Sequence, residues 1–222
     1  MNMSVSQIFR PTIAKKLILG FLSYGILTLL VAALALLSLQ QLNEINNRII
    51  ERDVPLVGIA DKMIETLLAQ ELYGRRSLIL RSSETEALFW KRSEAFKKLL
   101  LQMGNLPDTS GLPLDRLTTL HEEYNRLFKA GLEKREDLSS RAFQGRDRQI
   151  RQKQEELIQL VNRILVDAKK DQNEKSLRTL RVGRSAFWVI AGLSIGGLFL
   201  GMTIALIITR NISRSVNQLK LS

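Results

Sequence analysis

The 222-residue chain contains no cysteine, and this absence excludes several kinds of chemistry at once. Disulfide bridges, thiolate metal sites and cysteine nucleophiles are impossible without it. Histidine occurs once, at His121, so it has no imidazole or thiolate partner for a metal ion. The sequence also lacks a glycine-rich phosphate loop and any nucleophile–base constellation. We therefore predict no catalytic residue, no metal and no cofactor, and we expect that this chain is not itself an enzyme.

Acidic residues are missing from both ends of the chain. All 22 of them lie between Glu44 and Glu174, whereas residues 1–39 and 185–222 carry only basic charges. The formal net charge of +11 would on its own favour nucleic acid as a partner. In the middle of the chain, however, basic and acidic residues are interspersed, as on the solvated faces of helices. We therefore predict no nucleic-acid binding.

Charged residues are also absent from two long apolar runs, at positions 17–39 and 185–209. At about 1.5 Å per helical residue, each run exceeds the roughly 30 Å of hydrocarbon in a bilayer. The pattern Ala33-Leu34-Ala35 also fits the end of a cleaved signal peptide, but the first run continues past it. We predict two transmembrane helices, with the lipid bilayer as a partner.

Basic residues near the N-terminus set the expected orientation. Arg10, Lys15 and Lys16 precede the first run, so the positive-inside rule places this end in the cytoplasm. Two crossings then return the C-terminus to the same side, although the second run, with basic residues at both ends, does not orient itself. The expected parts are a cytoplasmic tail (1–16), a first span (17–39), an extracytoplasmic segment (40–184), a second span (185–209) and a cytoplasmic end (210–222).

The segment 40–184 favours four helices. Its apolar residues recur at spacings of three and four, as on helices with one buried face. Asp53-Val54-Pro55 predicts a kink in the first helix, because proline removes a backbone donor. A capping box at 83–86 predicts the start of the second helix, and Pro113 predicts that of the third after a turn-rich connection. A weak point at 139–145 precedes the fourth. We expect an all-α fold: an antiparallel four-helix bundle on a two-helix stalk.

The residues at the C-terminal end resemble a known linker. Residues 208–219, Ile-Thr-Arg-Asn-Ile-Ser-Arg-Ser-Val-Asn-Gln-Leu, are similar to the start of a HAMP domain, which follows the last membrane helix of bacterial sensor kinases and chemoreceptors. Ser215 stands where that family usually has proline. The layout of anchor, helical outer segment and second span also resembles four-helix-bundle sensor domains, in which the Asp53-Val54-Pro55 step and a segment like 89–96 recur. The positions that fit the HAMP pattern are Arg210, Ile212, Val216 and Leu219.

The resemblance implies the input half of a homodimeric receptor in the bacterial inner membrane, with residues 40–184 in the periplasm. A sensor histidine kinase is the first expectation and a chemotaxis receptor the second. The output domain would lie beyond Ser222, so the present chain would be a fragment or a truncated product. A membrane-anchored helical interaction protein without signalling output remains the alternative. The stimulus would be an unidentified small ligand or periplasmic protein.

Two arginines and the histidine attract a functional interpretation. Arg75 and Arg76 form a basic cluster far from the membrane, and arginine suits bidentate recognition of carboxylate or phosphate. A solvated face paired with glutamates is the simpler interpretation. His121-Glu122 is similar to the start of a kinase phosphoacceptor motif, but no proline follows and the pair lies between the two spans. We expect His121 to be an exposed or partly packed helix residue.

Four glycines in the second run form two pairs with small-xxx-small spacing, Gly192 with Gly196 and Gly197 with Gly201. At 100° per residue the two pairs occupy different faces of the helix. One face would meet the first span and the other a second copy of the chain, although glycine is also common in membrane helices without such contacts.

Phe187 and Trp188 are placed to anchor the outer end of the second span. Just before them, the polar segment 169–176 predicts a weakly packed seam. A shift of the fourth outer helix would pass through this seam to the second span.

Overall fold

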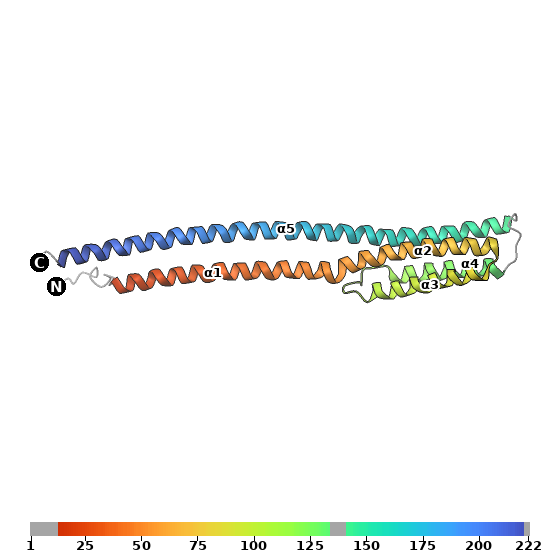
Figure 1. Ribbon diagram of the computed structural model, residues 1–222, viewed down its shortest axis with the longest axis horizontal. Helices are drawn as coiled ribbons and strands as arrows, with labels where there is room; N and C mark the ends of the chain where they lie inside the picture. The colour runs from red at the N-terminus through yellow and green to blue at the C-terminus, as the bar shows by residue number, and fades with distance from the viewer. Residues whose placement is uncertain (1–12, 134–140, 220–222) are drawn as a thin grey trace, which may run out of the picture. The chain divides into compact units, whose positions relative to one another are not determined.

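The computed structural model describes residues 13–133 and 141–219, and within them every regular element is a helix (Figure 1). The predicted all-α class is therefore confirmed for the described residues. Most of the predicted tail, residues 1–12, lies outside them. The elements are α1 (Ile13–Arg48), the π-helical turn η2 (Ile49–Asp53), α2 (Val54–Leu80), α3 (Ser83–Gly104), α4 (Leu114–Glu133) and α5 (Arg141–Leu219).

The chain divides into two compact units. The first, here called the core unit, is Ile45–Leu177. The second, the apolar unit, combines Met1–Glu44 with Arg178–Ser222. The long helices α1 and α5 contribute residues to both units.

In the core unit, α2, α3, α4 and the first part of α5 lie side by side and share one hydrophobic core (Figure 1). Buried residues recur on each helix at alternating spacings of about three and four, the pattern of helices that pack nearly parallel. Four aromatic side chains fill the centre, and the rings of Phe89 and Phe128 stack with centroids 3.6 Å apart. The fully buried aromatic residues are Phe89, Phe96, Tyr124 and Phe128.

The start of α3 lies one residue from its predicted cap. The N-cap of α3 is Ser82 rather than Ser83, because the Ser82 hydroxyl accepts the Thr85 N–H at 3.4 Å. Glu86 does not reach back as a capping box requires; its carboxylate accepts the Trp90 indole N–H at 3.3 Å instead. The residue before this cap, Arg81, ends α2 in the left-handed conformation with φ 55°.

Pro55 distorts the first helix of the segment 40–184 near the predicted position, although the chain stays helical there. Val54 donates its N–H to the Ile49 carbonyl, five residues earlier, so the turn before Pro55 is π-helical. Pro55 has no N–H to donate to the carbonyl of Glu51, and widening the turn avoids a steric clash there. The expected kink or break is therefore a π turn, which also changes the direction in which Asp53 points.

The third helix of the segment 40–184 begins near its predicted position, and the fourth begins earlier than predicted. α4 starts at Leu114, directly after Pro113. α5 starts at Arg141, so Gly145 lies inside a helix and does not mark a turn. The prediction of a weak point at 139–145 is therefore wrong from residue 141 onward, and residues 139 and 140 lie outside the described ranges.

The apolar unit exposes most of its large apolar side chains. The helices long and apolar enough to cross a membrane cover Gly20–Leu80 and Arg141–Ile207, and 0% and 6% of their most apolar windows are buried. The two apolar helical segments do touch along one stripe: a Cβ added at Gly197 would lie 3.0 Å from Leu27 Cδ2.

Candidate functional site

Arg75 and Arg76, the predicted anion site, lie on α2 with exposed side chains. Arg75 Nη1 is 3.6 Å from a carboxylate oxygen of Glu71, one turn earlier on the same helix. Among the described residues, no ion pair involves Arg76. The structure thus divides the cluster into one arginine with a carboxylate neighbour and one without, and anion binding stays a prediction.

The surroundings of Arg75 are charge-compensated. Gln154 on α5 donates to the second carboxylate oxygen of Glu71 at 2.8 Å, and Arg151 on α5 pairs with Asp147. These side chains line a space of about 10 Å³, which is no larger than a water molecule needs. A preformed pocket for an organic ligand is therefore not found at this place. Burial, together with the charge of Glu71, raises the pKa of the neighbouring Tyr124 phenol.

The two glycine pairs of the second run have different surroundings. Added Cβ atoms at Gly197 and Gly201 would lie 3.0 Å from Leu27 and 3.7 Å from Tyr24, both on α1. At Gly192 and Gly196 nothing lies within 4 Å. The structure thus places the pair at 197 and 201 against α1, and the described residues leave the face of the other pair uncovered.

The HAMP-like residues lie at the end of α5. The helix continues to Leu219, so the backbone of Ile212, Val216 and Leu219 is helical. Arg210 is exposed, and the side chains of the other three lie outside the described part of the chain.

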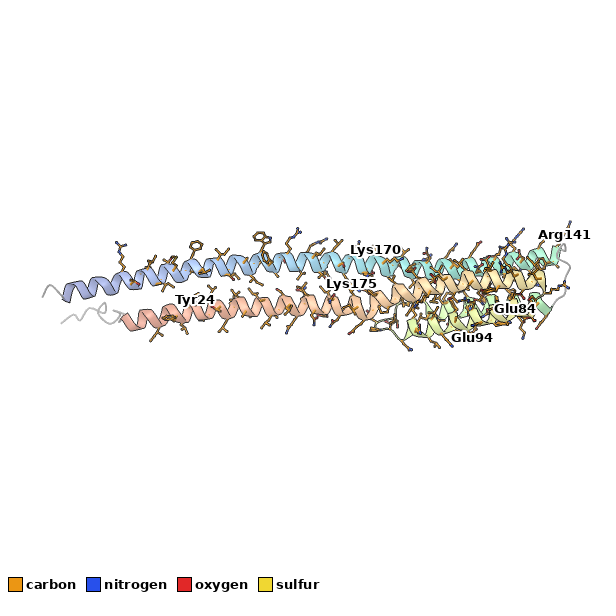
Figure 2. All side chains as sticks on the ribbon, in the orientation of Figure 1. Tyr24, Glu84, Glu94, Arg141, Lys170 and Lys175 are labelled. Carbon is orange, nitrogen blue, oxygen red and sulfur yellow. The ribbon has the colours of Figure 1, made fainter. Side chains whose placement is uncertain are left out.

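A buried ion pair joins the π turn to α5 in the core unit. Asp53, the last residue of η2, is 1% exposed. Lys175 of α5 donates to both of its carboxylate oxygens, at 2.9 and 2.7 Å. Figure 2 shows Lys175 on the side of α5 that faces η2 and Lys170 on the opposite side. A buried carboxylate without hydrogen-bond donors is strongly unfavourable, so the two hydrogen bonds from Lys175 stabilise this arrangement.

A second cation and a second acid border this pair. Arg52 Nη1 lies 3.8 Å from Asp53 and also 3.8 Å from Asp108, which is in the connection between α3 and α4. The Arg52 Nε atom is buried and has no hydrogen-bond partner in the described part of the chain. Three segments distant in sequence therefore meet through charges at this end of the core unit.

The polar segment 169–176 is less loosely held than predicted. Besides Lys175, its first residue, Lys169, lies 3.7 Å from Asp61 of α2. The expected weakly packed seam is therefore a surface with defined ion pairs, one exposed and one buried. The sequence pattern did not reveal that the π turn η2 carries Asp53, the carboxylate that binds Lys175 of this segment.

His121 belongs to a second buried polar cluster, between α2, α3 and α4. It is 2% exposed, so the expectation of an exposed or partly packed side chain is wrong. Its ring packs on Phe96 with centroids 4.4 Å apart, and Nε2 lies 3.5 Å from the Ser93 hydroxyl. Asn125 links the cluster together, since it donates to Ser93 and accepts from Gln70, both at 2.9 Å.

The electrostatics of this cluster favour a neutral histidine. Burial, more than the charge of Lys97, lowers the pKa of His121 to about 4, against a smaller opposing effect of Glu94. The imidazole is therefore uncharged at neutral pH. The Oε1 atom of Gln70 is buried without a hydrogen-bond partner among the described residues, so the cluster is incompletely satisfied.

The buried polar residues occupy positions that the apolar pattern skips. Ser93 lies between Phe89 and Phe96, and Gln154 lies between Ile150 and Leu157. Each of these apolar stripes has a gap of seven residues at this place. Such a gap predicts a buried polar residue, because a position on the stripe faces the core whatever residue fills it.

No group of three or more metal-ligating side chains occurs in the part of the chain that the structure describes. Comparison of the chain with protein-family models, with curated proteins and with solved structures finds no match. The interpretation of the site therefore depends on the geometry of the chain itself.

Proposed function

We propose that this chain is the transmembrane signal-input module of a bacterial sensor histidine kinase. In this proposal the core unit belongs to an extracytoplasmic antiparallel four-helix bundle, residues 40–184, between spans at 17–39 and 185–209. The HAMP-like residues 210–222 continue into the cytoplasm toward an output domain. The protein is a homodimer in the inner membrane, with both termini in the cytoplasm, and responds to a small ligand or a periplasmic protein.

The observation that carries this proposal is the Asp53–Lys175 ion pair. Asp53 ends the turn that follows α1, and Lys175 lies on α5, so the pair connects the two helices that also contain the apolar runs. A buried, doubly hydrogen-bonded pair favours one discrete register of the two helices, because other positions lose both hydrogen bonds from Lys175 and leave Asp53 only the longer contact with Arg52. Such a contact suits a switch between two arrangements.

The proposed mechanism follows from this geometry. A stimulus that changes the packing of the core unit weakens or strengthens the contact between Lys175 and Asp53. α5 then slides, tilts or rotates by a small amount relative to α2, and the displacement passes along the same helix to the HAMP-like residues. The π turn contributes because it holds Asp53 in the interior, where its partner matters most.

A fusion protein tests the mechanism. Residues 1–222 replace the corresponding N-terminal part, up to the start of the HAMP domain, of a histidine kinase with a known reporter gene, so that residues 210–222 continue in helical phase into the rest of its HAMP domain and its kinase domain. Lys175→Met and Asp53→Asn should each change basal reporter output severalfold, and the double variant should return toward the parent, because it leaves no uncompensated charge. Lys170→Met, on the exposed side of the same helix, is the matched control. Output equal to the parent in both single variants would contradict the mechanism.

The absence of cysteine makes the proposed topology directly testable. Ser110→Cys introduces one thiol in the exposed connection between α3 and α4. In intact spheroplasts, a membrane-impermeant maleimide should label this variant, and it should label Ser213→Cys only after permeabilisation. Labelling of Ser213→Cys in intact spheroplasts would exclude a cytoplasmic C-terminus.

A further inference from the structure

Three arginines and a tryptophan form one stripe on α5, within the apolar unit. Arg178, Arg181, Arg184 and Trp188 follow one another at spacings of three, three and four residues, so consecutive members are neighbours on the helix surface. All four are exposed, and the Trp188 side chain is 69% exposed. Ten residues of helix separate the first from the last, or about 15 Å.

The arginines of this stripe have no anionic partner in the part of the chain that the structure describes. None of their guanidinium groups takes part in an ion pair or hydrogen bond there. The core unit behaves differently, because several of its exposed cations pair with carboxylates, as Lys97 does with Glu94 and Lys129 with Glu133. In the apolar unit the sole acidic residue is Glu44, and none follows Glu174 in the sequence.

The position of the stripe indicates what compensates its charge. It directly precedes and enters the apolar run at 185–209, so Arg184 is adjacent to the first residue of that run. Tryptophan is enriched at membrane interfaces, where its ring lies among the headgroups. Neighbouring cations of like charge repel one another at helical spacings of three and four. A surface rich in phosphodiester anions at this depth would remove the repulsion and accept the guanidinium N–H groups.

We propose that Arg178, Arg181, Arg184 and Trp188 bind the headgroups of anionic phospholipids in the leaflet at the outer end of the second span. This inference rests on the proposed insertion of the apolar unit into a membrane. The guanidinium groups contact phosphate oxygens, and the indole ring lies at the boundary of headgroups and acyl chains. By the positive-inside rule, few basic residues are expected on the extracytoplasmic side. Binding to lipid headgroups would explain why basic residues nevertheless precede the run at 185–209 on that side.

The two tryptophans of the chain allow a direct test with the full-length protein. Trp90→Phe leaves Trp188 as the single fluorophore, on the same stripe as the arginines. The protein is reconstituted in vesicles of phosphatidylcholine and phosphatidylglycerol, and one of the two lipids carries brominated acyl chains, which quench nearby tryptophan. At equal mole fraction, brominated phosphatidylglycerol should quench Trp188 more strongly than brominated phosphatidylcholine, and added salt should reduce the difference.

Matched charge variants assign the effect to the stripe. A basic residue near an anionic leaflet favours binding by roughly fivefold, so Arg178→Gln, Arg181→Gln and Arg184→Gln together should remove most of the preference for phosphatidylglycerol. Lys91→Gln, Arg92→Gln and Lys98→Gln remove the same charge from exposed positions on α3 and should leave the preference intact. A preference that survives in the arginine triple variant would overturn the assignment.

The remaining outcomes separate this inference from the proposed function. Equal quenching by the two brominated lipids would overturn the lipid preference and leave membrane insertion supported. No quenching by either lipid would show that Trp188 is not at a bilayer, and both the inference and the proposed membrane function would then fail.

Discussion

The core unit and the apolar unit both consist of helices, but they place apolar and charged side chains in opposite ways. Phe89 in the core unit is 0% exposed, whereas Phe199 in the apolar unit is 68% exposed. The first unit covers its apolar side chains with neighbouring helices, and the second leaves them on the surface. Charges show the reverse: the core unit buries Asp53 with a partner, while the arginines at 178, 181 and 184 have none within the described residues.

This contrast is the one expected if, as proposed, the apolar unit lies in a membrane and the core unit in water. Helices in water must bury an apolar face against protein, whereas helices in lipid need no protein cover for it. A polar residue has the opposite requirement, because a buried one needs a hydrogen-bonding partner in the chain and an interfacial one does not. Substitutions that are equivalent in chemistry should therefore have unequal effects in the two units.

The largest difference is expected for phenylalanine. Phe89→Ala should lower the free energy of unfolding of the core unit by about 3–5 kcal/mol, because the cavity beside Phe128 cannot close fully. Phe199→Ala should change it by less than about 0.5 kcal/mol. Hydrogen exchange of α3 and α4 amides in nanodiscs measures both. Equal effects of the two substitutions would abolish the distinction between the units.

The buried His121 should make the stability of the core unit depend on pH. Its pKa of about 4 lies below the ordinary value near 6.5, so the unfolded chain binds more protons between these values. Stability conferred by the neutral ring is therefore complete above pH 6.5 and is lost as the pH falls toward 4. From above pH 7 to about pH 5, the core unit should lose about 2 kcal/mol.

A substitution separates this effect from that of the carboxylates. His121→Gln retains a hydrogen-bonding side chain beside Ser93 but does not titrate. Trp188→Phe leaves Trp90, which packs on Phe89 and Phe128, as the reporter of thermal unfolding. Melting temperatures should fall between pH 7 and pH 5 for the parent and change much less for His121→Gln. An unchanged pH dependence would show that other groups cause the loss.

The helices and their boundaries could be predicted from the sequence to within a few residues, because apolar spacing and proline act locally. The π turn before Pro55 appeared only as a kink, since the sequence does not say how a missing donor is accommodated. The Asp53–Lys175 pair could not be predicted, because it depends on the register of helices that are 122 residues apart in sequence. The burial of His121 was missed, since it was expected to be exposed or partly packed, although Leu117, Leu120 and Tyr124 outline the stripe that includes it.

Glycine substitutions should have intermediate effects that differ between faces. An added Cβ at Gly74 would lie 3.0 Å from Phe89, and one at Gly197 would lie 3.0 Å from Leu27, so Ala at either position should cost about 1–3 kcal/mol in packing. Gly192→Ala meets nothing within 4 Å and should leave packing inside the chain unchanged.

A disulfide reports on the packing of the apolar unit. An added Cβ at Gly20 would lie 3.0 Å from Ile204 Cγ2, which brings Gly20→Cys and Ile204→Cys within reach of a bond. Gly197→Ala should lower the yield of this disulfide, and Gly192→Ala should not. Loss of yield with Gly192→Ala would mean that its face also packs on α1. A fall in dimer crosslinking with Gly192→Ala alone would instead support contact with a second copy.

The smallest effects on stability are expected at Arg75 and Arg76. Both are exposed, and an exposed ion pair such as that of Arg75 with Glu71 contributes about 0–1 kcal/mol, so Ala at either position should change stability by less than about 0.5 kcal/mol. Anion binding separates them, because Arg75 already has a carboxylate neighbour. Calorimetry of the full chain in nanodiscs with inorganic phosphate should show a weaker signal for Arg76→Ala than for Arg75→Ala. Arg92→Ala on α3 is the control for bulk charge, and equal losses in all three variants would reduce the cluster to a solvated face.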